Sequence, residues 1–195
     1  LIISAPSGAG KTTIIRQLMN SDPRLAFSVS TTTRKRRTGE TEGVSYYYTD
    51  EATFREMIDA GEFAEWAKVH TGHYGTSKKE IDRIRAAEKI PVFDVDVQGA
   101  CNLRRNIDDA VLIFIMPPSI GVLAERLRQR NTESEEELKI RISNAISELR
   151  EYRNYDYIVI NDQLEDAIAD TRAIIRAELL RCGRMSAKVD AILEE

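Results

Sequence analysis

The chain begins LIISAPSGAGKTT (residues 1–13), and this stretch determines how the rest is interpreted. Residues 1–4 are a short apolar run typical of a buried strand, and a helical pattern starts at Lys11. In residues 8–12 (GAGKT), small residues let successive backbone N–H groups point into one concavity, where the helix start adds partial positive charge. The pattern predicts a phosphate-binding loop in which Lys11 reaches the β- and γ-phosphates and Thr12 binds Mg²⁺. The usual first glycine is here Ala5.

Further apolar runs alternate with amphipathic stretches along the chain. Residues 91–96, 111–116 and 157–161 are expected strands, and residues 111–116 are apolar throughout, as in strands covered on both faces. This order predicts an α/β fold, with a parallel sheet core of the P-loop NTPase type flanked by helices. At the end of the chain, helical spacing predicts one helix docked on the sheet through five positions: Leu164, Ile168, Ile175, Leu179 and Cys182.

Two segments interrupt this alternation. Residues 31–77 are rich in Thr, Gly, Tyr and charge, with an expected helix at 51–60 and an expected strand at 62–70. Residues 119–149 are mostly charged helix, with a turn and cap at 131–134. We therefore predict a single domain with a core (1–30, 78–118 and 142–195), an insertion containing β-strands (31–77) and a helical lid (119–141).

Composition limits the class of protein. The 195 residues carry a formal net charge of −4 and are 42% hydrophobic, which fits one globular domain and argues against disorder and against a general nucleic-acid binder. The longest apolar run, 110–116, is far shorter than the roughly 20 residues that cross a bilayer. No signal peptide is expected, and because the chain starts with Leu1 we expect a few residues to precede it. Cys101 and Cys182 have no metal or disulfide spacing, which favours a reducing, cytoplasmic compartment.

Two carboxylates stand near the end of the expected strand 91–96. Asp94 and Asp96 alternate along it, so both are expected to project from one face near its carboxyl end. That end lines the ligand crevice in open α/β sheets, where a carboxylate can orient Mg²⁺ or its water shell. A solvated strand end is the alternative, and the phosphate-binding loop favours the functional interpretation.

A basic run, residues 34–37 (RKRR), stands out in this acidic chain. Hydroxyl residues precede it at 28 and 30–33, and three tyrosines follow at 46–48. Arginine, hydroxyls and tyrosine around one loop suit a second phosphate with an attached ring. A nuclear localisation signal or a solvated face would explain the run equally well, and the tyrosines could be packing.

The segment 119–149 carries more arginines. Arg126, Arg128 and Arg130 precede its turn and Arg141 follows it, which suggests a lid that brings arginines onto transferring phosphates. The alternative is a salt-bridged surface hairpin, because the arginines are balanced by Glu125, Glu133, Glu135, Glu136 and Glu137. Two histidines, His70 and His73, lack a third ligand and are interpreted as loop residues.

Together these motifs resemble the guanylate kinase family. The resemblance runs in order from Leu1 through the C-terminal helix, and it rests on residues 4–12, 30–34, Arg37, 39–40, Glu65, 74–76, 94–99 and 160–162. It implies Mg²⁺-dependent transfer of a phosphoryl group from ATP to GMP, giving ADP and GDP, with dGMP as a further candidate acceptor. No nucleic-acid or membrane partner is expected, and the oligomeric state is left open.

The resemblance also implies residue roles. ATP would be bound by Ala5, Pro6, Ser7, Gly8, Ala9, Gly10, Lys11, Thr12 and Thr13, with Arg126 and Asn161 nearby. GMP would be bound by Ser30, Arg34, Arg37, Tyr46, Glu65, Tyr74, Thr76 and Asp96. Mg²⁺ would be held, partly through water, by Thr12 and Asp94. The catalytic residues would be Lys11, Arg34, Arg130 and Arg141.

Chemistry supports one of these roles independently. Guanine presents N1–H and N2–H₂ donors on one edge, which a carboxylate such as Glu65 accepts as a pair, whereas the adenine N1 acceptor would oppose it. A kinase acting on a phosphorylated sugar would need no such group. A catalytically inactive guanylate-kinase-like interaction module is the other alternative, although Lys11, Thr12 and the lid arginines are present.

Overall fold

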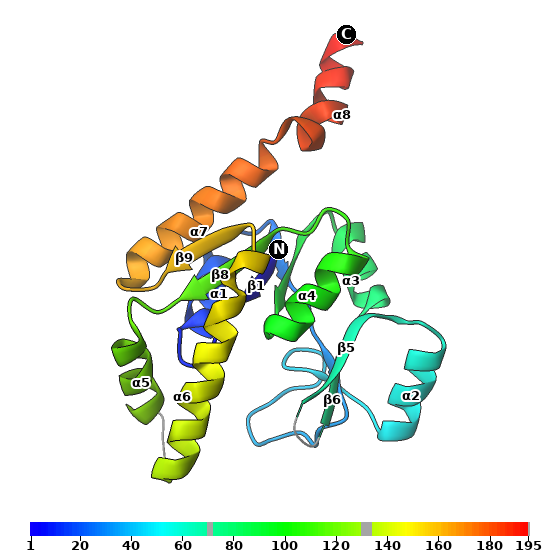
Figure 1. Cartoon of the computed structure of the whole chain (residues 1–195). Helices are drawn as coiled ribbons and strands as arrows, with labels where there is room; N and C mark the ends of the chain where they lie inside the picture. Colours follow the sequence, from blue (N-terminus) through cyan, green and yellow to red (C-terminus); the bar gives the residue numbers. More distant parts are fainter. Residues whose placement is uncertain (70–71, 130–133, 195) are drawn as a thin grey trace.

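The core is a parallel sheet of five strands in the order β2-β7-β1-β8-β9 (Figure 1). We describe residues 1–69, 72–129 and 134–194 of a computed structural model. All four strand pairs are parallel, and β1 lies at the centre with Ile3 opposite Asp94 on one side and Ile113 on the other. The strands are β1 (Ile2–Ser4), β2 (Leu25–Phe27), β7 (Ile90–Asp94), β8 (Leu112–Met116) and β9 (Tyr157–Ile160). The predicted α/β fold class is confirmed.

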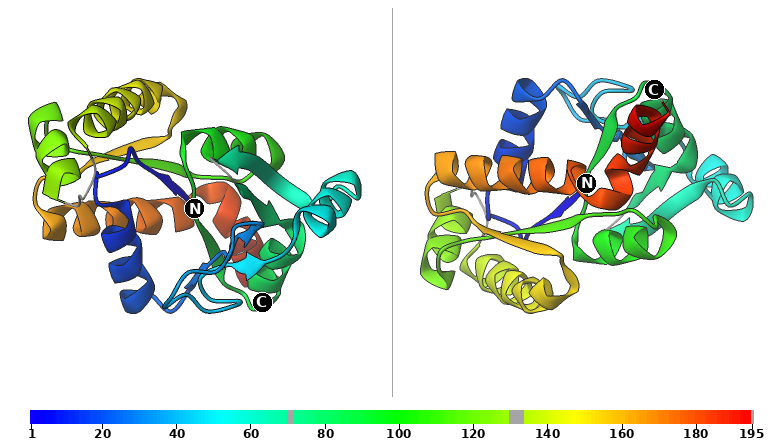
Figure 2. Two further views of the ribbon diagram at one scale, coloured as in Figure 1. Left: turned by 90° about the horizontal axis from the view of Figure 1, so that it is seen from below. Right: turned by 90° about the horizontal axis from the view of Figure 1, so that it is seen from above.

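Helices cover both faces of this sheet (Figure 2). Alternation along the strands divides the core: Ile3 and Ile113 pack with residues of α1 (Lys11–Ser21) and α7 (Leu164–Leu179). Their neighbours Ile2 and Leu112 point to the other face, where they pack with residues of α3 (Lys78–Ala86) and α4 (Val97–Asn106). Apolar positions on both faces of each strand explain why the sequence reads as continuous apolar runs.

A second sheet lies within residues 31–77, in the order β4-β3-β6-β5. Its strands are β3 (Thr31–Thr32), β4 (Tyr47–Tyr48), β5 (Phe63–Val69) and β6 (Gly72–Ser77), and α2 (Glu51–Asp59) joins β4 to β5. Phe54 of α2 stacks on Phe63 of β5, with ring centroids 4.5 Å apart. The segment leaves the core after β2 and returns to it at α3, so it is attached at the carboxyl edge of the core sheet.

The charged segment after β8 forms a helical pair, α5 (Ile120–Gln129) and α6 (Glu135–Leu149), followed by a 3₁₀ turn at Arg150–Asn154. A small core of its own holds the pair together, built on Leu123, Leu127 and Ala145. The predicted cap is present at Ser134, whose side chain accepts from the Glu137 N–H while Glu137 reaches back to the Ser134 N–H. Residues 131–133 of the predicted turn lie outside the described residues.

Two of the secondary-structure elements predicted from the sequence are wrong. The strand expected at 91–96 ends at Asp94, and Asp96 is the N-cap of α4, so the two carboxylates do not share a strand face. The expected C-terminal helix is two helices, because α7 ends at Leu179 and α8 (Cys182–Leu193) follows it. None of α8 is buried, Cys182 is exposed, and α8 projects from the rest of the fold (Figure 1). Helical periodicity predicted which apolar positions share one face but could not show whether another element covers that face.

The other predicted elements are present with small shifts at their ends. The helix expected to start at Lys11 runs to Ser21, and the one expected at 51–60 ends at Asp59. The strand expected at 62–70 runs over Phe63–Val69, and residue 70 lies outside the described part of the chain. In the described ranges, no helix combines the length and the apolar content that crossing a membrane would need.

Close packing at Gly75 gives a test of the second sheet. A Cβ at this position would lie 2.8 Å from two ring atoms of Phe63, whose ring is held by the stack on Phe54. We expect Gly75→Ala to lower the free energy of unfolding by roughly 1–3 kcal/mol through overpacking, measured by urea denaturation. Gly183→Ala in α8, where a Cβ meets nothing within 4 Å, is the control and should not destabilise the fold. Equal stability of the two variants would contradict this packing.

Candidate active site

The phosphate-binding loop depends on two glycines and one amide. Gly8 and Gly10 have φ of +90° and +95°, in the left-handed region that favours glycine. A Cβ on Gly10 would also overlap the side-chain amide of Asn161. That amide is buried and donates a 2.7 Å hydrogen bond to the Ala9 carbonyl oxygen. Asn161, which follows β9, therefore holds the loop in shape from across the sheet.

The loop leaves the start of α1 open to an anion. Side-chain caps close the starts of α2, α3, α4 and α6, but Gly10 gives α1 no side-chain cap. The first N–H groups of a helix have no acceptor within it, and together they carry partial positive charge. In the first turn, the Lys11 ammonium pairs with the Asp94 carboxylate and donates to the Val95 carbonyl oxygen at 2.7 Å. Loop and lysine together suit phosphate groups.

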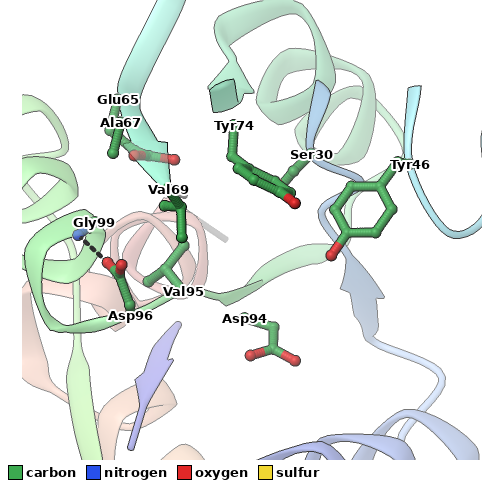
Figure 3. A pocket seen from close by; sticks show the side chains of 10 residues that line it. All are labelled: Ser30, Tyr46, Glu65, Ala67, Val69, Tyr74, Asp94, Val95, Asp96 and Gly99. Atoms are coloured by element: carbon green, nitrogen blue, oxygen red, sulfur yellow. Dashed lines mark hydrogen bonds between the residues drawn. The ribbon is translucent and has the colours of Figure 1, made fainter. Parts of the chain in front are cut away.

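Beside the loop lies a cavity of about 240 Å³ (Figure 3). Its lining comes from the residues directly before β3 and β4, from β5 and β6, and from the end of β7 through the first turn of α4, so residues far apart in the sequence meet there. Asp94 lines the cavity and also pairs with Lys11, which joins the cavity to the phosphate-binding loop. The lining residues are Ser30, Tyr46, Glu65, Ala67, Val69, Tyr74, Asp94, Val95, Asp96 and Gly99. Six of them are predicted site residues.

Glu65 is a buried carboxylate on the wall of this cavity, with 8% of its surface exposed. It lies opposite Thr76 in the β5–β6 register, and the Thr76 hydroxyl donates to its Oε1 at 2.8 Å. Burial raises the pKa of Glu65, the hydrogen bond from Thr76 opposes that rise, and the charge of Asp96 adds to it. A buried carboxylate with a raised pKa is typical of a functional site, where a ligand can supply further hydrogen-bond donors.

Tyr46 and Tyr74 line another part of the cavity, and Arg34 lies over the Tyr46 ring. The guanidinium of Arg34 lies 5.2 Å from the Tyr46 ring centroid, and the Tyr46 and Tyr74 rings meet edge to face at 5.8 Å. Arg34 donates to Glu40 Oε1 at 2.6 Å. We therefore find a cation and two phenol rings at one end of the cavity.

Glu40 holds the basic segment 34–37 in place, a role that was not predicted from the sequence. Its Oε2 accepts from the Tyr48 hydroxyl and from the Arg37 backbone N–H, both at 2.7 Å. Arg34 and then the Arg37 N–H lower the pKa of Glu40 to about 2. The signal in the sequence was a glutamate six residues after an arginine. Arg37 itself contributes its backbone here, and its side chain does not line the cavity described above.

The helical pair reaches the loop from the other side. Arg141 of α6 donates to the Ser7 hydroxyl at 3.1 Å, and Arg126 of α5 donates to the Asn161 carbonyl oxygen at 3.1 Å. A second cavity of about 440 Å³ lies there, lined by Gly8, Gly10, Thr13, Arg126, Gln129, Asn161, Asp162 and Leu164. The structure thus places Arg141 against Ser7 of the loop and Arg126 against Asn161, and Arg130 lies outside the described residues.

Thr12 and Asp94 are the residues that fit a magnesium ion. Both offer oxygen ligands, and Asp94 faces the loop through its contact with Lys11. Mg²⁺ needs few protein ligands, because substrate phosphates and water complete its shell. Across residues 1–69, 72–129 and 134–194, no three His, Cys, Asp or Glu side chains cluster as metal ligands. His73, which was expected in a loop, lies in β6 instead, with its Nδ1 3.0 Å from Glu51 Oε2, and His70 is outside the described ranges.

A glycine-dependent phosphate loop at the carboxyl edge of a parallel sheet, with a separate polar cavity beside it, defines a P-loop nucleotide kinase. Comparison with known proteins agrees. The guanylate kinase family model matches residues 1–178. The chain is 46% identical over 185 residues to the guanylate kinase of Myxococcus xanthus (94% of this chain, 88% of the relative) and 45% identical over 193 residues to that of Geobacter sulfurreducens (99% and 94%).

A solved structure extends the agreement to three dimensions. The crystal structure of guanylate kinase from Anaplasma phagocytophilum has a TM-score of 0.74 and 29% identity, covering 94% of this chain and 87% of that one. This chain belongs to the guanylate kinase family, and the predicted guanylate kinase function is confirmed.

The raised pKa of Glu65 predicts a conflict between stability and function. A glutamate whose pKa is higher in the folded state favours folding below its unfolded pKa and loses that contribution as the pH rises through the folded pKa. Glu65→Gln should therefore be more stable than the unsubstituted protein at pH 7, and this advantage should shrink toward pH 4.5. Thermal unfolding at both pH values measures it, with Glu62→Gln at an exposed position as control. An advantage that grows on acidification would contradict the burial argument.

Proposed function

We propose that this chain transfers the γ-phosphoryl group of ATP to GMP, giving ADP and GDP, with Mg²⁺ as the metal ion. The observation that carries the proposal is the buried Glu65 carboxylate in a cavity that shares Asp94 with the phosphate-binding loop. One pocket then holds the acceptor nucleotide, and the loop beside it holds the donor.

Guanine is read by Glu65, with Ser30, Thr76 and Asp96 around it. Glu65 Oε1 already accepts from Thr76, and its remaining acceptor sites face the N1–H and N2–H₂ donors of the base. AMP would oppose an acceptor to this buried carboxylate, and such an unpaired buried group costs far more than a lost apolar contact. Base choice therefore rests on Glu65.

The phosphate of GMP is bound by Arg34, Arg37, Tyr46 and Tyr74. Arg34 is held beside Tyr46 by its ion pair with Glu40, so its charge is already oriented before the acceptor arrives. Preorganised charge costs little rearrangement at the moment of binding. This arrangement is the reason to assign the basic run to a small anion rather than to localisation or to a solvated face.

ATP is held by residues 5–13, and Arg126 and Asn161 stand beside the cavity that suits its base. The open N-terminus of α1 and Lys11 bind the phosphates. Thr12 and Asp94 would hold Mg²⁺, which when bound supplies charge neutralisation between the β- and γ-phosphates. Asp94 serves both the metal and the orientation of Lys11 in this proposal.

Transfer needs no general base, since the GMP phosphate is largely dianionic at neutral pH, with a second pKa of about 6. The requirement is to align two polyanions and to stabilise charge on the group in transit, which we assign to Lys11, Arg34, Arg130 and Arg141. Closure of the insertion (31–77) and the lid (119–141) on the core would exclude water. Because α6 continues from Glu135 to Leu149, lid motion would carry this whole helix.

We also propose a cytoplasmic location. The support is chemical: Cys101 and Cys182 are both free thiols in the structure, as suits a reducing compartment.

A phosphoryl-transfer screen tests the function. ATP and Mg²⁺ are supplied with GMP, dGMP, AMP, CMP, UMP or dTMP, and ADP formation is followed. We expect transfer to GMP, with AMP and the pyrimidine nucleotides at least 100-fold poorer in kcat/KM, because none of these bases presents the adjacent ring N–H and exocyclic NH₂ donors that Glu65 would accept as a pair. Transfer to none of them would contradict the proposal and favour either a binding module or the related kinase that acts on a phosphorylated sugar.

Lys11→Met tests the phosphate-binding loop. Loss of this ammonium should lower kcat by at least about 100-fold, as is usual when a group that stabilises the transition state is removed. The measurement is a coupled assay for ADP, with circular dichroism to show that the fold is retained. Lys89→Met, at an exposed position before β7, is the control and should keep normal turnover. Near-normal activity of Lys11→Met would exclude the assigned role.

A further inference from the structure

Glu80 is a buried carboxylate next to the GMP cavity that does not line it. It lies in the first turn of α3 and is 3% exposed. Its Oε1 accepts from the Val29 N–H at 3.2 Å and its Oε2 from the Tyr47 hydroxyl at 3.3 Å. Arg83, one turn on, donates to both oxygens at 2.8 Å and compensates the charge. A buried carboxylate with four donors from three segments is unusual for a surface helix and needs an explanation.

The same chain shows what such a glutamate ordinarily does. Ser134 and Glu137 form a capping box at the start of α6, with Glu137 reaching back to the Ser134 N–H at 2.9 Å. At the start of α3, Ser77 caps the Glu80 N–H at 3.2 Å in the same spacing, yet the Glu80 carboxylate accepts from Val29, Tyr47 and Arg83 instead. Helix capping alone does not account for these contacts.

Both distant partners of Glu80 adjoin residues of the GMP cavity. Val29 precedes Ser30, and Tyr47 follows Tyr46, and Ser30 and Tyr46 both line the cavity. The two segments also meet directly, because the Tyr47 N–H donates to the Ser30 carbonyl oxygen at 2.9 Å. Glu80 therefore links two segments of the cavity to α3 of the core: the segment of Ser30, which is assigned to the base, and the segment of Tyr46, which is assigned to the phosphate.

We propose that Glu80 is a positioning residue for GMP: it holds Ser30 and Tyr46 at their correct separation without touching the nucleotide. This inference rests on the proposed function. Charge-assisted hydrogen bonds are the strong kind, and a buried carboxylate bonded to a backbone N–H restricts that backbone. Through Val29 and Tyr47, this restriction is passed to the cavity.

Glu80→Gln keeps the shape of the side chain but presents an amide N–H₂ to donors that need an acceptor. We expect the KM and the calorimetric dissociation constant for GMP to rise about tenfold, since at least one charge-assisted hydrogen bond to a cavity segment is lost. The KM for ATP should stay within about twofold and kcat within about threefold, because the donor loop is untouched.

A second variant isolates one contact and does not depend on the buried charge. Tyr47→Phe removes only the hydroxyl that reaches Glu80, at a half-buried position where the ring can stay in place. We expect a rise of about two- to fourfold in the GMP dissociation constant, with ATP binding unchanged. This variant keeps the proposal testable even if Glu80→Gln fails to fold.

Glu178→Gln is the matched control. Glu178 is also 3% exposed, accepts from a tyrosine hydroxyl (Tyr157, 2.6 Å) and pairs with an arginine one turn on (Arg181, 3.4 Å), but it lies at the end of α7 away from the GMP cavity. Both glutamine variants should lose stability, and only Glu80→Gln should weaken GMP binding.

The outcomes separate two failures. If the unsubstituted protein does not phosphorylate GMP, the proposed function fails before Glu80 is tested. If it does, any of three results overturns the positioning role: Glu80→Gln and Tyr47→Phe keep the GMP constants of the unsubstituted protein, they weaken GMP and ATP binding alike, or Glu178→Gln weakens GMP binding as much as Glu80→Gln does. In each case Glu80 is only structural.

Discussion

The ion pair between Lys11 and Asp94 joins the phosphate-binding loop to the cavity beside it, and the order of strands in the sheet makes this contact possible. Lys11 follows β1 and Asp94 ends β7, and these strands are neighbours in the parallel sheet. The insertion leaves the core after β2, which is the other neighbour of β7. The helical pair leaves it after β8, which is the other neighbour of β1. Because every carboxyl end lies at one edge, each piece reaches the same place.

Two cations of the site, Lys11 and Arg34, are each held by a carboxylate beside it. Asp94 holds Lys11, and Glu40 holds Arg34, whose pKa is raised chiefly by that pairing. An acidic chain can thereby keep concentrated positive charge in the directions that two phosphate groups require. The net charge of −4 describes the average and conceals this local order.

Local features were predictable from the sequence and distant partnerships were not. Gly8 and Gly10 have the positive φ that favours glycine, so the loop and its flanking strand and helix could be predicted from neighbouring residues. Asp96 was misassigned because alternation continues past the end of a strand, while its capping of Gly99 shows only in three dimensions. The partners of Glu80 come from residues 29 and 47, a separation that no local pattern reveals. The break between α7 and α8 was missed because the helical spacing of apolar residues continues across it, from Leu179 to Cys182.

The buried glutamates differ in how their acceptor capacity is used, and this difference separates recognition from support. Glu80 and Glu178 each face an arginine and a tyrosine hydroxyl, so their charges are compensated within the protein. Glu65 faces the Thr76 hydroxyl and the charge of Asp96, and its raised pKa reports that its ionised form is poorly compensated. Burying a charge under those conditions costs stability, and a ligand that brings two N–H donors recovers it. In the proposed function, recognition of guanine and the stability cost of burying Glu65 are therefore two consequences of the same poorly compensated carboxylate.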